Sequence, residues 1–153
     1  MRMKIIKFEQ NVMMKLFHMY LARYADMEKV DTYFNEAAPV MEQMIEEAGE
    51  GKWLLGTDEL TLLDIQCGAI LDFMYTALKA PTNSEAQARA NLSVTAPKWM
   101  AYQERLRAHP KIAPVCMNQE AMDRHMARTR TWEPADVKCQ LSLAPLMGLF
   151  EGC

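Results

Sequence analysis

A capped, apolar helix is predicted between Thr61 and about Leu78, and few fold classes can accommodate it. Thr61 is placed to accept a hydrogen bond from the first amides of a helix, and Asp64 can accept one from the amide of Thr61. Leu60, just before this capping box, and Ile65, in the first turn, supply the hydrophobic staple that fixes how the chain enters the helix. The following residues are apolar on nearly every side, which is typical of a helix at the centre of a bundle.

Amphipathic helices are predicted before this central helix. Residues 8–25 carry apolar side chains at spacings of three and four, as one face of a helix does. Residues 31–48 repeat the pattern, with Asp31 as the N-cap. Pro39 predicts a kink or a late start in this second helix, because proline has no amide hydrogen and clashes with the carbonyl four residues back.

Two more helices are expected after the central one. Residues 79–95 have the composition of a loop with one short helical turn. A helix then begins near Pro97, a residue suited to the first helical position, and stops at His109 and Pro110. A last helix is expected over residues 111–129, with Ile112, Val115, Met122 and Met126 on its apolar face.

Composition supports a single all-α domain. A chain of 153 residues fits one domain, and 50% hydrophobic with 24% charged residues is enough to form a buried core. Glycine and proline, 6 and 7 residues, are too few for the frequent turns of an all-β fold. We therefore expect a five- to six-helix bundle over residues 1–131. Residues 132–153 form an apolar tail that we expect to pack on the bundle or on a partner.

Charge narrows the classes of partner. The net charge of −3 gives no overall basic surface for nucleic acid, so we expect none as a partner. No apolar stretch of about 18 residues occurs, so no transmembrane segment is expected. Residues 1–24 carry five basic side chains and one acidic one, whereas residues 25–72 carry two basic and twelve acidic ones. We expect a cytoplasmic protein; the alternative is the mitochondrial matrix, because a basic start resembles a presequence.

The cysteines and histidines predict neither disulfides nor a metal site. Cys67, Cys116, Cys139 and Cys153 include no C-x-x-C pair and are too sparse for a disulfide scaffold, so we interpret them as reduced thiols. The three histidines, His18, His109 and His125, lie far from the cysteines in sequence.

Three stretches resemble the C-terminal helical domain of glutathione transferases. Residues 51–65 are similar to the loop and capped core helix of that domain, with an apolar pair, a glycine, a polar turn and the Thr61–Asp64 box. Residues 38–48 look like the proline-containing helix before this loop, and residues 96–112 like the helix that follows. The resemblance spans about residues 34–117 in the right order and implies the all-helical fold of that domain.

The resemblance also implies what this chain lacks. The family's enzymes bind glutathione mainly through an N-terminal thioredoxin-like domain, which supplies the residue that activates the thiol. Here the start of the chain shows no strand pattern beyond Ile5 and Ile6. Without a group that lowers the pKa of the thiol, little reactive thiolate forms. We therefore expect no catalytic residues and no cofactor.

Two main hypotheses for the function of this chain remain. The first is a non-catalytic module in protein–protein interaction or in the assembly of a larger complex, with a protein partner or a homo-oligomer. The alternative is a divergent or truncated glutathione transferase that retains glutathione or hydrophobic-ligand binding. His18, Tyr20 and Tyr24 are the candidate residues for a residual ligand groove, although they can equally fill a core or an interface. A third interpretation is an unrelated helical bundle.

Overall fold

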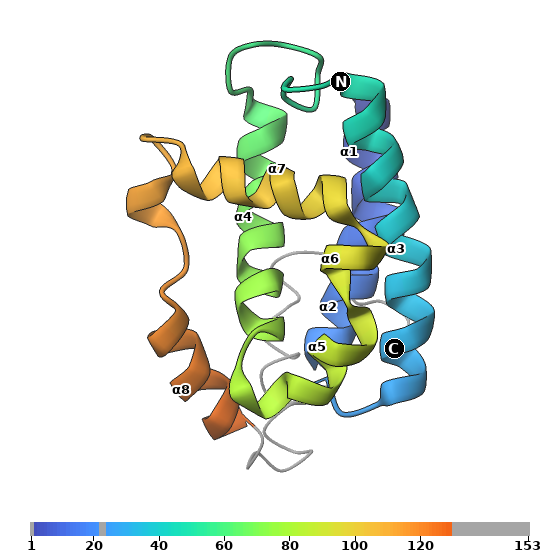
Figure 1. Cartoon of the computed structure of the whole chain (residues 1–153), viewed down its shortest axis with the longest axis vertical. Helices are drawn as coiled ribbons and strands as arrows, with labels where there is room; N and C mark the ends of the chain where they lie inside the picture. Colours follow the sequence, from blue (N-terminus) through green and yellow to red (C-terminus); the bar gives the residue numbers. More distant parts are fainter. Residues whose placement is uncertain (1, 22–23, 130–153) are drawn as a thin grey trace.

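The computed structural model describes residues 2–21 and 24–129, and over these residues it is built from helices without any β-strand (Figure 1). With the first helical run taken as one unit, this part of the chain contains six helices, the single turn α6 and two short 3-10 segments, η2 and η3. The predicted all-α bundle of five to six helices is confirmed. The predicted apolar tail, residues 132–153, lies outside the described residues.

The first helical run contains α1 (Arg2–Phe8), a π-helical segment η1 (Glu9–Met13) and α2 (Met14–Leu21). The predicted start at residue 8 is wrong, because the helix already includes Arg2. In η1 the Met14 amide donates to the Glu9 carbonyl, five residues back. Of the predicted apolar stripe, Phe8, Val12, Leu16 and Met19 are buried, whereas Tyr20 is only partly buried.

The second helix, α3 (Met27–Ala48), starts earlier than predicted. Its N-cap is Asp26, whose carboxylate accepts a hydrogen bond from the Lys29 amide at 3.1 Å. Asp31 is therefore not the cap; it lies inside the helix and pairs with Arg89 at 2.6 Å. The helix runs continuously through Pro39, so the alternative of a late start is also wrong.

The central helix, α4 (Leu62–Leu78), has the predicted boundaries and the predicted capping box at Thr61. Leu60 is half-buried and packs against the core. The helix is not enclosed on every side, because Leu62 is 59% exposed and Ile65 is 45% exposed. These two residues begin a stripe that continues through Ala69 and Phe73, at the three- and four-residue spacing of one helix face.

The remaining elements are shorter. After α4 come η2 (Pro81–Asn83), α5 (Ser84–Ala90), α6 (Leu92–Thr95), α7 (Pro97–Ala108), η3 (Ala113–Val115) and α8 (Gln119–Thr129). The predicted helix over residues 111–129 is therefore wrong in its first half. Val115 is 76% exposed, and of the four predicted apolar positions only Met122 and Met126 are buried.

In the bundle, α3 packs against the first helical run and α4 lies beside them, with α7 crossing α3 and α4 (Figure 1). α8 packs against the C-terminal half of α4. Gly68 allows α7 to come close, since a Cβ there would lie 2.3 Å from Leu106 Cδ2. None of the helices over residues 2–21 and 24–129 is long and apolar enough to cross a membrane.

Candidate functional site

The exposed stripe of α4 forms the floor of an apolar groove. The segment that follows α7 forms its wall, and together they enclose about 290 Å³. We use the name apolar groove for the space lined by Ile65, Ala69, Phe73, Ile112, Val115 and Met117. Leu62 lies on the same helix face beyond Ile65 and extends the apolar surface. A surface of this kind on a folded domain is typical of an interaction site.

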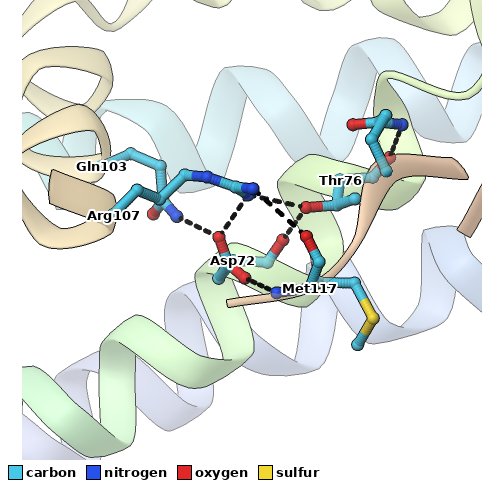
Figure 2. Close-up of polar contacts among 6 residues, drawn as sticks. Asp72, Thr76, Gln103, Arg107 and Met117 are labelled. Carbon is cyan, nitrogen blue, oxygen red and sulfur yellow. Dashed lines mark hydrogen bonds and ion pairs between the residues drawn. The ribbon is translucent and has the colours of Figure 1, made fainter. Parts of the chain in front are cut away.

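A partly buried ion pair holds the wall of the groove against α4 (Figure 2). Asp72, whose side chain is only 7% exposed, accepts from Arg107 Nη1 at 2.6 Å and from Gln103 Nε2 at 3.0 Å. Its second oxygen accepts from the Met117 amide at 2.7 Å, and Arg107 Nη2 donates to the Met117 carbonyl at 3.2 Å. Both backbone groups of Met117 are thus fixed by α4 and α7.

Thr76 extends this network toward α8. Its hydroxyl donates to the Asp72 carbonyl at 2.7 Å and accepts from Arg107 Nη1 at 3.1 Å (Figure 2). Gln119, the first residue of α8, donates to the Thr76 carbonyl at 3.0 Å. The sequence analysis missed this network, although one signal was present: Asp72 is a charged residue in the middle of a mainly apolar helix.

A second buried aspartate fixes the N-terminal end of α4. Asp64 Oδ2 accepts from the Thr61 amide at 3.0 Å and from the Thr61 hydroxyl. Asp64 Oδ1 accepts from the Leu54 amide and from the Tyr102 hydroxyl, both at 2.9 Å. The predicted cap residue therefore also joins the 49–61 loop and α7 to α4. Both aspartates direct their oxygens to protein donors, so the groove presents mainly apolar atoms.

Phe73, which lines the groove, belongs to an aromatic cluster that joins α2, α4 and α8. The ring of Tyr20, on α2, packs edge-on against Phe73 at 5.0 Å between centroids. The Tyr20 hydroxyl hydrogen-bonds His125 Nε2, on α8, at 2.6 Å. Burial raises the pKa of Tyr20 and lowers the pKa of His125, to which the charge of Arg128 adds a further lowering. Of the three candidate residues, Tyr20 thus contacts Phe73, a residue that lines the groove, without lining it itself.

The other two candidate residues lie elsewhere. Tyr24 is 1% exposed and donates from its hydroxyl to the Met74 carbonyl at 3.3 Å, so it is part of the core. His18 packs beside Tyr33 of α3, with 6.2 Å between ring centroids. None of His18, Tyr20 and Tyr24 lines the apolar groove.

The two described cysteines are poor sources of thiolate. Burial, with help from Asp64 and Glu9, raises the pKa of Cys67 to about 12. Burial and the nearby Asp72 raise the pKa of Cys116, with Arg107 acting in the opposite direction. Cys116 lies at the wall of the groove and is partly exposed. Over the described ranges, no three His, Cys, Asp or Glu residues are grouped as metal ligands.

A larger depression, of about 640 Å³, lies between α3 and α7. Both of its lysines pair with carboxylates: Lys98 with Glu46 at 3.0 Å, and Lys52 with Asp58 at 2.6 Å. The guanidinium of Arg105 stacks over the Trp53 ring at 4.4 Å from the centroid. This depression is therefore a weaker candidate site than the apolar groove.

Comparisons with protein-family models, with curated proteins and with solved structures find no match to this chain. The resemblance to glutathione transferases stays a prediction that rests on the motif residues.

Proposed function

We propose that the chain is a non-catalytic helical module, similar to the C-terminal domain of glutathione transferases, that acts through protein–protein interaction. The observation that carries the proposal is the exposed stripe of α4 and the apolar groove beside it. Exposed apolar faces of this kind are seldom left uncovered in a soluble domain, and another surface normally packs on them. The partner is a second copy of this chain or another subunit of a complex.

The construction of the groove favours a binding role. Asp72 and Arg107 fix the backbone of the wall, so the site is held in place before any partner arrives. A preorganised site loses less conformational entropy on binding than a mobile one. The chemistry of the groove favours an apolar side-chain surface over a charged substrate, because the buried aspartates beneath it already accept hydrogen bonds from the protein.

Site-specific photo-crosslinking tests the proposal. A photoreactive amino acid at Ile65 should give intermolecular products, either with the pure protein or in native extract. Val94, on α6, is the matched control, because it is an aliphatic residue 71% exposed outside the groove. The Ile65→Asp variant should also reduce the associated fraction in size-exclusion chromatography with light scattering, whereas Val94→Asp should not. A clean monomer without position-specific products would contradict the proposal.

The same protein preparation tests the alternative function. Retention on glutathione resin together with turnover of an electrophilic aromatic substrate would favour a divergent glutathione transferase. Failure of both by well-folded protein would remove that alternative.

A further inference from the structure

We propose that the exposed face of α4 packs against the same face of a second copy of this chain, in a two-fold dimer whose two α4 helices run parallel. This inference rests on the proposed function and names the partner. Of the six large apolar side chains exposed over the described residues, five belong to α1, α4 and η3: Met3, Ile6, Leu62, Ile65 and Val115. The exposed apolar surface is therefore concentrated on and beside α4.

The exposed face of α4 carries no exposed charged side chain. Next to the exposed stripe, this face presents Gln66 and Ile70. A helix face in contact with water normally carries charged residues. In a dimer with its two-fold axis parallel to α4, each residue of this face meets its own counterpart, so a charge there would repel its copy. Gln66 has no such conflict, because its amide both donates and accepts hydrogen bonds.

The two flanks of the stripe have complementary shapes. On one flank lies the wall of the apolar groove, where Val115 is 76% exposed. On the other flank, a second depression of about 220 Å³ lies between α4 and the first helical run, and its lining includes Ile5, Gln66 and Ile70. A two-fold axis parallel to α4 turns the wall of each copy toward this depression in the other copy. A projecting apolar residue then meets an apolar hollow.

Two charges flank the stripe in a complementary way. Glu9 lines the second depression, and Lys111 precedes Ile112 at the wall of the groove. Both side chains are exposed, and neither forms an ion pair with another described residue. The proposed axis turns Glu9 of each copy toward Lys111 of the other, which places opposite charges together at two points. Antiparallel α4 helices would instead turn each wall, with its Lys111, toward the other wall, where like charges repel.

Ala69 and Gln66 favour one register for the two helices. Ala69 has the smallest side chain of the stripe and lies one turn from both Ile65 and Phe73. Because the distance between packed helices depends on the side chains at their contact, the helices can approach most closely at Ala69. Gln66 lies almost one turn away, like the single polar residue that fixes register and helix number in an apolar coiled-coil interface.

Charge reversal tests this arrangement in the full chain. Glu9→Lys places like charges at both contact points of a dimer, and Lys111→Glu does the same with the opposite sign. Each variant alone should raise the dimer dissociation constant about tenfold in analytical ultracentrifugation. An equal mixture of the two variants should associate as well as the parent, because each contact of the mixed dimer again joins opposite charges. Glu104→Lys, at an exposed position of α7, is the control and should leave the constant unchanged.

A symmetric disulfide tests the register. In a chain with Cys116→Ser, Cys139→Ser and Cys153→Ser, the further change Ala69→Cys should give a disulfide-linked dimer under mild oxidation. The proposed arrangement places the two copies of this residue face to face, within the short distance that a disulfide requires. Val94→Cys, at an exposed position of α6, is the matched control and should stay unlinked in non-reducing electrophoresis.

The outcomes separate this inference from the proposed function. A monomeric parent, a mixture of charge variants that associates no better than either alone, or an unlinked Ala69→Cys protein would each overturn the parallel dimer. Photo-crosslinks from Ile65 to a different protein would in that case still support the proposed function with another partner. No crosslink of any kind from Ile65 would contradict both. Restored association in the mixture together with the disulfide at residue 69 would support the dimer.

Discussion

At the scale of single residues, the two buried aspartates of α4 organise the structure around the groove. Asp64 and Asp72 each accept hydrogen bonds from distant parts of the chain, and each joins α4 to α7. A buried carboxylate is stable only when protein groups replace its lost hydration. Replacing either aspartate should therefore lower the free energy of unfolding more than removing a surface charge does.

The capping box gives a graded prediction. Thr61→Ala removes one cap and should reduce the free energy of unfolding by about 0.5–2 kcal/mol. Asp64→Ala should cost about 3–5 kcal/mol, because the Leu54 amide and the Tyr102 hydroxyl also lose their acceptor inside the protein. Urea denaturation followed by circular dichroism measures both values.

Thr57→Ala is the control for this pair. The Thr57 hydroxyl donates to the Glu59 carbonyl at an exposed site. Its removal should therefore change the free energy of unfolding by no more than about 0.5 kcal/mol. Equal costs for Thr61→Ala and Asp64→Ala would show that Asp64 does not support the loop and α7.

The Asp72–Arg107 pair predicts strong coupling. Asp72→Leu and Arg107→Met should each destabilise the protein by about 2–4 kcal/mol, because each leaves a partly buried charge without its partner. The double variant should be more stable than the sum of the single effects by about 1–3 kcal/mol. A double-mutant cycle by chemical denaturation measures this coupling.

The exposed pair Glu120 and Arg124 on α8 serves as the comparison. Its coupling should be about 0.3–0.5 kcal/mol, the range for exposed pairs one helical turn apart. A coupling of the same size at Asp72 and Arg107 would mean that the buried network does not hold the wall.

At the scale of elements, the important difference from expectation is the shape of the chain around α4. The expected last helix is split into η3 and α8, and the segment between α7 and α8 becomes the wall of the groove. Proline at residues 110 and 114 interrupts the helical pattern there, because proline supplies no amide hydrogen. The groove therefore arises where one helix ends early and another leaves a face uncovered.

Pro39 offers a prediction about α3. It lies on the exposed side of a continuous helix, where it leaves the Asn35 carbonyl without its usual amide donor. Pro39→Ala should raise the free energy of unfolding by about 1–2 kcal/mol, since the restored helical bond outweighs the extra freedom of the unfolded chain. Thr32→Ala, also exposed on α3, should change it by only about 0.5 kcal/mol. A neutral or negative effect of Pro39→Ala would contradict this account.

At the scale of the whole molecule, the contact between Tyr20 and His125 joins α2, near the start of the chain, to α8. The two residues are 105 positions apart in sequence. Tyr20 also packs against Phe73, which lines the groove. A substitution that breaks this contact should therefore disturb both the packing of α8 and the packing of Phe73 in the groove.

The lowered pKa of His125 predicts how stability depends on pH. The folded chain binds this proton less readily than the unfolded chain does. The contribution is therefore complete above the unfolded pKa of about 6.5 and is lost as the pH falls below it. The melting temperature should be lower at pH 5.5 than at pH 7.5, and His125→Gln should reduce this difference. An unchanged difference in the variant would assign the pH dependence to other groups.

Much of the fold could be predicted because its signals are local. The capping box involves Thr61 and Asp64, three residues apart, and the boundaries of α4 follow from it. The buried stripe of the first helical run also follows from spacing within one helix. The predicted start of α3 was wrong because two nearby residues, Asp26 and Asp31, can both cap a helix.

The sequence by itself determined the helices and the cap, because their hydrogen bonds join residues within a few positions of each other. Only the tertiary structure decided which side of α4 stays uncovered and where the groove lies. Asp72 meets Arg107 and Met117 across 35 and 45 positions, and no periodicity within a helix encodes such a pairing. Burial depends on which neighbours cover a face, so the groove exists only once α7 and α8 are in place.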